Sequence, residues 1–223
     1  MAISLAAEEA EYWADRGSTY LWMERYQEAL ADFDRAIELK PDLAWAIAHR
    51  GETYRRMERY QEALADFDRA IELKPDDAWA ILRRGEVRIQ LACYDEALTD
   101  LNLAIALEPT AWRYYSRALV SLALTQSNKA HLDLKEAIRR AEDVYEEDPG
   151  DWRNTLNLAL YYLASGETEA SENLYQEALG GASLYQIRAA IRDLEEFLHI
   201  LPNHSQAQTV RNLLQKHLQE AEA

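Results

Sequence analysis

The feature that most constrains this chain is an internal repeat. Twenty residues from Met23 to Asp42, MERYQEALADFDRAIELKPD, recur without a change from Met57 to Asp76, 34 residues later. A third and diverged copy runs from Cys93 to Pro109. Prolines and glycines keep the same interval: Pro41, Pro75 and Pro109; Gly17, Gly51 and Gly85. A fixed period of this length predicts a stack of similar units, each burying its apolar face against its neighbours.

Each unit is predicted to be a pair of antiparallel helices. Within residues 60–73 the apolar side chains recur at steps of three and four, which indicates one buried stripe on a helix. Pro75 ends this stripe because proline is not tolerated inside a helix. Residues 45–54 carry a second stripe, and Gly51 in its middle predicts a close approach of the two helices, since glycine otherwise weakens a helix. A short turn near Glu58 would join them.

These repeated residues resemble the tetratricopeptide repeat. The second unit matches that family's pattern at Gly51, Tyr54, Tyr60, Ala63, Phe67, Ala70 and Pro75. The third unit departs from it at Arg88 and Leu101, where the other units have tyrosine and phenylalanine. The resemblance covers residues 10–111 and implies an all-α fold, a right-handed superhelical solenoid of antiparallel helix pairs with a C-terminal capping helix. Arrays of this kind resemble repeat regions of large bacterial signalling proteins, so a fragment of such a protein is one interpretation.

After residue 111 the period lengthens but the helical pattern continues. Pro109 to Pro149 spans 40 residues and Pro149 to Pro202 spans 53, so longer helices are expected in this part. We predict a single repeat domain over residues 1–223. Its units are expected at about 10–43, 44–77, 78–111, 112–151 and 152–181, followed by a diverged helix pair and cap at 182–223.

Charge and cysteine content exclude several classes of function. The formal net charge is −16 and no block of the chain is basic, which argues against binding to nucleic acid or to anionic membranes. One cysteine, Cys93, allows no intramolecular disulfide, and we expect it to be a packed small residue. The N-terminal residues show no signal-peptide pattern. A cytoplasmic protein is therefore predicted.

No catalytic or metal-binding pattern is present. The chain has no glycine-rich phosphate loop followed by Gly-Lys-Ser or Gly-Lys-Thr. Its five histidines are scattered without the spacing of metal ligands, and we expect them to be exposed or at helix caps. We therefore predict no enzyme activity, no cofactor and no metal.

The resemblance also implies a binding surface, because the first helices of such arrays line a concave groove. The residues that fall on groove-facing places are Trp22, Trp45, Glu52, Arg55, Arg56, Trp79, Leu82, Glu86, Gln90 and Tyr115. Tryptophan and arginine are frequent interface anchors, so a protein or peptide partner is predicted. A second interpretation of Trp45 and Trp79 is that they pack on the preceding helix end and anchor the stack.

The groove-facing places differ from those of one subclass of the family. Family members that grip acidic chaperone tails use lysine, asparagine and arginine where this chain has Ala14, Ser18, Glu52, Leu82 and Glu86. We therefore expect no binding of such tails.

The sequence is also compatible with self-association. The chain could form a homo-oligomer or serve as an oligomerisation module of a larger signalling protein, and this is the alternative function. An engineered array would explain the perfect copy of twenty residues, but it fits the diverged later units poorly.

Overall fold

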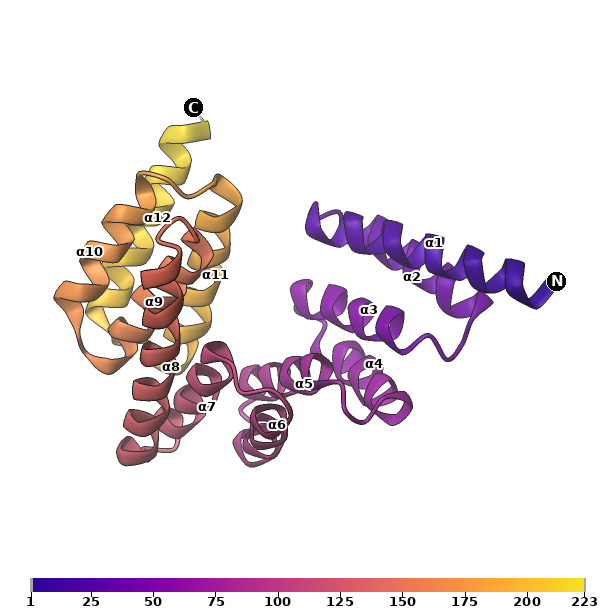
Figure 1. Ribbon diagram of the computed structural model, residues 1–223, viewed down its shortest axis with the longest axis horizontal. Helices are drawn as coiled ribbons and strands as arrows, with labels where there is room; N and C mark the ends of the chain where they lie inside the picture. The colour runs from indigo at the N-terminus through magenta and orange to yellow at the C-terminus, as the bar shows by residue number, and fades with distance from the viewer. Residues whose placement is uncertain (1, 223) are drawn as a thin grey trace. The chain divides into compact units, whose positions relative to one another are not determined.

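The chain folds entirely into helices. The computed structural model describes residues 2–222, and the surroundings of side chains from residue 8 to 221. Within that range it contains no strand, which confirms the predicted all-α class (Figure 1). The helices are α1 (Ala2–Trp22), α2 (Tyr26–Leu39), α3 (Ala44–Arg56), α4 (Tyr60–Leu73), α5 (Ala78–Gln90), α6 (Tyr94–Leu107), α7 (Ala111–Ala123), α8 (Ser127–Glu147), α9 (Trp152–Ser165), α10 (Thr168–Leu179), α11 (Leu184–Ile200) and α12 (Ser205–Glu222).

The helices fall into two compact units. Unit 1 is Met1–Leu107, with α1 to α6, and unit 2 is Glu108–Ala223, with α7 to α12. In both units consecutive helices pair, and each pair lies within one of the ranges expected from the sequence, apart from the earlier start of α1 and a start of α7 one residue early, at Ala111. The longer period after residue 111 is explained by α8, which has 21 residues, whereas the corresponding second helices α2, α4 and α6 have 14 residues each. The prediction of one repeat domain over the whole chain remains a prediction.

The turn inside each pair has one recurring conformation. Glu58 has a positive φ of 58°, its N–H donates to the Arg55 carbonyl at 3.0 Å, and the Arg59 N–H donates to the Tyr54 carbonyl at 2.9 Å. This is the Schellman arrangement, which satisfies the last carbonyls of a helix. Equivalent turns follow α1, α5, α7 and α9, at Glu24, Ala92, Thr125 and Gly166. The turn predicted near Glu58 is thereby confirmed.

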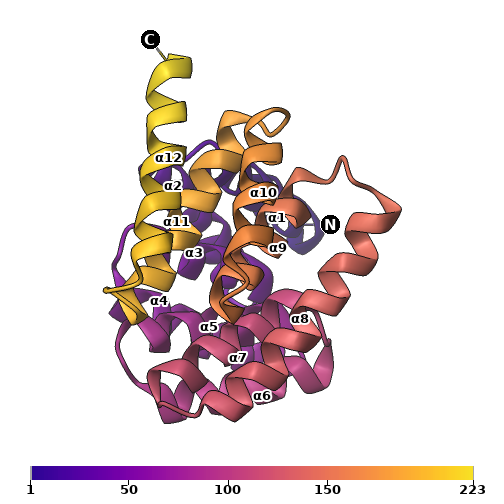
Figure 2. The same cartoon turned by 90° about the vertical axis from the view of Figure 1, so that its left-hand side faces the viewer.

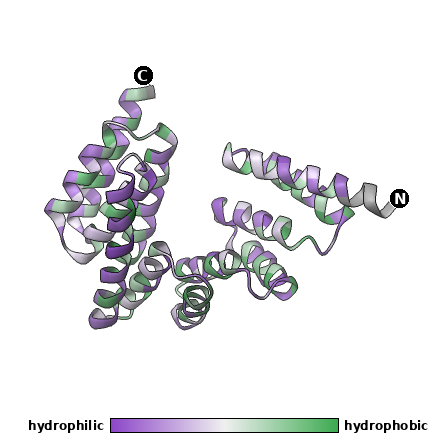
Figure 3. Ribbon diagram, in the orientation of Figure 1, coloured by the Kyte–Doolittle hydropathy of each residue, from purple (hydrophilic) through white to green (hydrophobic). Residues whose placement is uncertain are grey.

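The two helices of a pair meet at the repeated glycine. A Cβ atom on Gly51 would lie 3.2 Å from the Phe67 ring and 3.3 Å from the Ala63 carbonyl oxygen, so a larger side chain would displace α4. Phe67 itself is fully buried, as are Phe33 and Leu101 at the equivalent places of the neighbouring pairs. Hydrophobic and hydrophilic residues are interspersed along the coloured helices (Figure 3). The close approach predicted from Gly51 is confirmed.

A repeated ion pair also holds the pairs together. An arginine of the first helix binds an aspartate of the second in four pairs: Arg16–Asp32, Arg50–Asp66, Arg84–Asp100 and Arg117–Asp133. Arg50 and Arg84 reach back as well, to Asp34 and Asp68 on the preceding pair, at 2.6 and 2.8 Å. The ion pairs were not predicted from the sequence, although each arginine stands 16 residues from its aspartates.

The third helix pair, α5 and α6, packs like the others although it departs from the family pattern at two residues. Arg88 replaces the usual tyrosine and its Nη1 donates to Asp100 at 2.6 Å, so this aspartate binds two arginines. Leu101 replaces phenylalanine and is still fully buried. Both departures are therefore compatible with the same packing.

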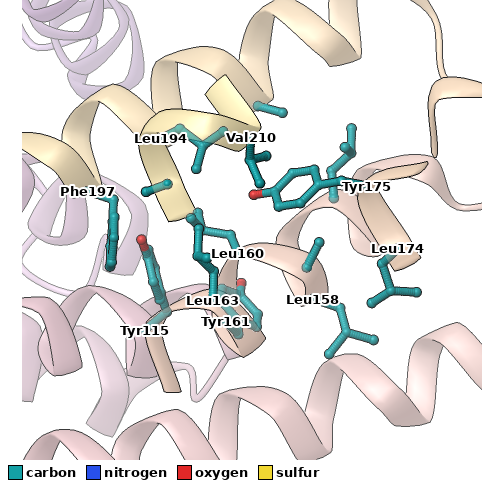
Figure 4. Packing of buried hydrophobic residues seen from close by; sticks show 14 of the residues in the cluster. Tyr115, Leu158, Leu160, Tyr161, Leu163, Leu174, Tyr175, Leu194, Phe197 and Val210 are labelled. Carbon is teal, nitrogen blue, oxygen red and sulfur yellow. The ribbon is translucent and has the colours of Figure 1, made fainter. Parts of the chain in front are cut away.

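Unit 2 ends in an arrangement that differs from simple stacking. α11 packs on α9 and α7, which are first helices of their pairs, while α12 packs on α11 and α10 (Figure 2). Tyr115 and Leu160 lie in one core cluster with Leu194 and Phe197 of α11 (Figure 4). The chain thus covers the first helices α7 and α9 with a helix of its own.

Candidate partner-binding site

Unit 1 has three first helices, α1, α3 and α5, and α3 contacts both of the others. Residues at 34-residue steps occupy equivalent places on them, such as Ser18, Glu52 and Glu86, or Trp22, Arg56 and Gln90. We call their common surface the first-helix face. It comprises Ser18, Trp22, Trp45, His49, Glu52, Arg55, Arg56, Trp79, Leu82, Arg83, Glu86 and Gln90.

An aromatic row crosses this face from helix to helix. Trp45 donates its indole N–H to Glu11 of α1 at 3.0 Å. The His49 ring stacks on Trp79 with centroids 4.9 Å apart and meets Trp45 edge-on at 5.7 Å. Each tryptophan therefore contacts the preceding first helix, which supports the interpretation that both anchor the stack. Both remain partly exposed and can still contact a partner.

His49 differs from what the sequence predicted. It is half-buried between the two tryptophan rings rather than exposed or at a cap, so that expectation is wrong for this residue. Its Nδ1 lies 2.8 Å from the Trp45 carbonyl oxygen. Burial lowers the pKa of His49 below its ordinary value, because the charged ring would lose its hydration. No local sequence pattern indicated this position, because Trp79 belongs to the next repeat.

A network of two carboxylates and three arginines lies beside the aromatic row. The Nε atoms of Arg55 and Arg56 each donate to Glu52 at 2.7 Å. Arg83 donates from Nη1 to Glu86 at 2.7 Å, and its Nε lies 3.9 Å from Glu52. Glu52 and Glu86 are only 4% and 5% exposed. The two carboxylates are thus more buried than Arg56 and Arg83, whose side chains are 22% and 18% exposed.

The charge state of Glu52 follows from these contacts. Burial by itself raises the pKa of this carboxyl, but attraction to Arg55, Arg83 and Arg56 outweighs burial and holds the pKa well below its ordinary value. Glu52 is therefore ionised at neutral pH.

The remaining predicted residues fall in two environments. Trp22 is 57% exposed at the end of α1, and Gln90 is half-buried at the end of α5. Leu82 is buried on α5. Tyr115 belongs to unit 2, where it is 1% exposed beneath α11. Its predicted groove-facing position is thereby corrected, because the chain's own helix covers it. Arg83 was not predicted as a site residue, although it follows Trp79 by one helical turn.

Comparison with known sequences settles the family. One family model described as tetratricopeptide repeat matches residues 8–76, and a second matches residues 49–111 and 115–185. The chain belongs to the tetratricopeptide repeat family. No curated protein matches this tetratricopeptide repeat chain significantly.

Several solved structures are similar to this tetratricopeptide repeat protein. A MamA structure from Desulfovibrio magneticus RS-1 is 19% identical over 77% of this chain and 94% of its own, with a TM-score of 0.55. Cut9, from a complex with Hcn1, is 18% identical over 93% of this chain and 43% of its own, with a TM-score of 0.63. The first such domain of Spaghetti (RPAP3), bound to an HSP90 peptide, is 24% identical over 53% and 95%, with a TM-score of 0.52. These likenesses show the shared fold.

Three further observations concern chemistry. Among the described residues no cluster of histidine, cysteine and carboxylate side chains has the geometry to hold a metal ion. None of the helices in that range is both long and apolar enough to cross a membrane. Cys93 is exposed before α6, so the expectation that it packs inside is wrong.

Proposed function

We propose that this tetratricopeptide repeat protein is a non-catalytic interaction scaffold that binds a partner protein or peptide on the first-helix face of unit 1. The observation that carries the proposal is a contrast between the two units. In unit 2 the chain's own α11 packs on first helices α7 and α9. In unit 1, among the described residues, the helices that pack closely on α1, α3 and α5 are their pair partners and the stacked neighbours.

The composition of the face supports the same function. Trp22 is largely exposed, and the arginines Arg55, Arg56 and Arg83 lie on the neighbouring first helices. Tryptophan and arginine are enriched among the residues that dominate binding energy at interfaces. The similar domain of Spaghetti is bound to an HSP90 peptide, which shows that a domain of this fold can hold a peptide.

Self-association is the second candidate function, but the contacts at the N-terminal end of unit 1 favour it less than they favour binding of a different partner. The guanidinium of Arg16 lies 4.5 Å from the Trp13 ring centroid and 5.8 Å from that of Tyr12. In the following pairs, the equivalent Arg50 and Arg84 instead bind an aspartate of the preceding pair. The aromatic rings of α1 thus already contact the guanidinium group that would otherwise bind an aspartate of a preceding unit.

Replacing Trp22 by alanine tests the proposed site. We expect the partner to bind at least about tenfold more weakly, because exposed tryptophan anchors typically contribute about 2 kcal/mol or more. The partner would be purified from the native host with the intact chain and titrated by calorimetry. Leu132→Ala is the matched control, since Leu132 is 67% exposed on α8 in unit 2. Equal affinities for both variants and the unchanged protein would contradict the proposal.

Acidic chaperone tails are expected not to bind. The buried Glu52 and Glu86 occupy two of the places where tail-binding relatives carry cations or amides, and the whole chain carries a net charge of −16. The HSP90 peptide SRMEEVD found on the Spaghetti domain is a suitable probe. Titration by fluorescence anisotropy should give no binding at micromolar concentration, and micromolar affinity would refute the expectation.

A further inference from the structure

Unit 2 provides an internal example of what a first-helix surface in this chain can hold. The N-cap residues of α3, α5, α7 and α9 are Leu43, Asp77, Thr110 and Asp151. Nine residues after these N-caps stand, in the same order, Glu52, Glu86, Leu119 and Leu160. In unit 2 the two leucines are buried in the core cluster that contains α11. A helix with an apolar face therefore packs where the leucines stand. In unit 1 the same places carry carboxylates, which an apolar helix would desolvate at high cost.

The charges of unit 1 indicate which group would be accepted instead. Arg55, Arg56 and Arg83 supply three positive charges, and Glu52 and Glu86 supply two negative ones, which leaves one positive charge. One carboxylate from a partner would neutralise the network. A basic group at this position would be repelled by the three arginines.

Unused hydrogen-bond donors lie in the same network. The Nε of Arg83 is buried and has no hydrogen-bond partner, because its 3.9 Å separation from Glu52 is too long for a hydrogen bond. Arg56 uses its Nε for Glu52, and its two terminal nitrogens make no described contact. The Arg56 side chain is 22% exposed, so its terminal nitrogens are the donors that an acceptor from outside would meet.

From these observations we infer that the first-helix face of unit 1 binds an amphipathic partner helix that places one carboxylate against Arg56 and Arg83 and one large apolar side chain against Trp22. This inference rests on the proposed function and names the chemistry of its partner. The helical form follows the example of α11 in unit 2.

The spacing of the two partner groups follows from the repeat. Trp22 and Arg56 are equivalent residues on neighbouring first helices. Packed helices lie about 8–10 Å apart, so the two contacts are separated by roughly that distance. Along a partner helix about 10 Å is seven residues, or two turns. The partner should therefore carry its apolar residue and its acidic residue at positions i and i+7.

Synthetic helical peptides can test this chemistry on the intact chain. One peptide has a neutral alanine and glutamine host with leucine at position i and glutamate at i+7. A matched peptide has glutamine at i+7, and a third has the glutamate at i+5, on another face of the helix. We expect the i+7 glutamate peptide to bind at least about tenfold more tightly than the other two, as measured by fluorescence anisotropy, because hydrogen bonds to charged groups are the strong ones.

Two variants of the protein locate the contact. Arg56→Gln should abolish the preference for glutamate over glutamine at position i+7. Trp22→Ala should weaken both i+7 peptides by the same factor. Arg56→Lys, which keeps the charge, should restore part of the preference, and circular dichroism of each variant checks that it is folded.

The outcomes separate this inference from the proposed function. Equal binding of the glutamate and glutamine peptides, with both still weakened by Trp22→Ala, would overturn the carboxylate assignment and leave the binding face intact. Absence of binding by every peptide at millimolar concentration, or affinities that Trp22→Ala does not change, would overturn the inference. If light scattering shows self-association that Trp22→Ala removes, the occupant is a second copy of this chain and the inference is also overturned.

Discussion

Arg50→Ala is expected to lower the free energy of unfolding of unit 1 by about 3–5 kcal/mol, the usual cost of breaking a buried ion pair by removing one partner. The Arg50 guanidinium binds Asp66 through two nitrogens, at 2.8 and 2.7 Å, and Asp34 of the preceding pair at 2.6 Å. Asp66 is buried and would lose both hydrogen bonds. The variant therefore weakens the second helix pair and its connection to the first.

Arg84 provides an internal comparison within the same repeat. Arg84→Ala should cost less than Arg50→Ala, because Arg88 continues to bind Asp100 at 2.6 Å. Arg139→Ala is the surface control: Arg139 is 54% exposed and its two ion pairs are exposed, so a loss below about 1 kcal/mol is expected. Urea denaturation followed by circular dichroism measures all three. If Arg50→Ala costs no more than Arg139→Ala, the interpretation of the repeated ion pair as a stabilising link is wrong.

Glu52→Gln should destabilise unit 1 by about 3 kcal/mol at neutral pH, because it leaves Arg55, Arg56 and Arg83 without their shared buried carboxylate. Glu62→Gln is the matched control, since Glu62 forms a single and largely exposed pair with Arg59. Its effect should stay below about 1 kcal/mol. The comparison separates the buried network from ordinary surface pairing.

The effect of Glu52→Gln should also depend on pH in a defined direction. The pKa of Glu52 is lower in the folded protein than in the unfolded chain. The ionised carboxylate therefore stabilises the fold fully above about pH 5, and this contribution declines as the pH falls below the ordinary glutamate pKa of about 4.3, where the unfolded chain takes up the proton first. The difference between the two proteins should shrink from pH 7 to pH 3. A difference that stays constant over this range would contradict the prediction.

Much of the fold could be predicted because its signals are local and periodic. The unchanged copy of Met23–Asp42 at Met57–Asp76, the glycine of each first helix in unit 1 and the proline after α2, α4 and α6 indicated helix pairs with a close approach. These features act within one unit, through helix periodicity and steric fit. The same period contained the arginine and aspartate pattern, which was not predicted because it links residues 16 positions apart on different helices.

The candidate site could be predicted only in part. The repeat indicated which places on the first helices of unit 1 align, and Trp22, Trp45, Arg55, Arg56 and Trp79 are among them. It did not indicate that His49 lies between two tryptophans or that Arg83 completes the Glu52 network, since both contacts join neighbouring repeats.

The sequence by itself determined the helix pairs, their turns and the family. Only the tertiary structure decided that α7 and α9 are covered, because α11 packs on them through contacts between residues far apart in the chain, such as Tyr115 and Phe197. The hydrophobic effect is non-directional, so Leu119 and Leu160 favour burial beneath some helix. No local sequence pattern specifies which helix covers them. In unit 1 the corresponding Glu52 and Glu86 oppose such burial and keep their arginines near the solvent.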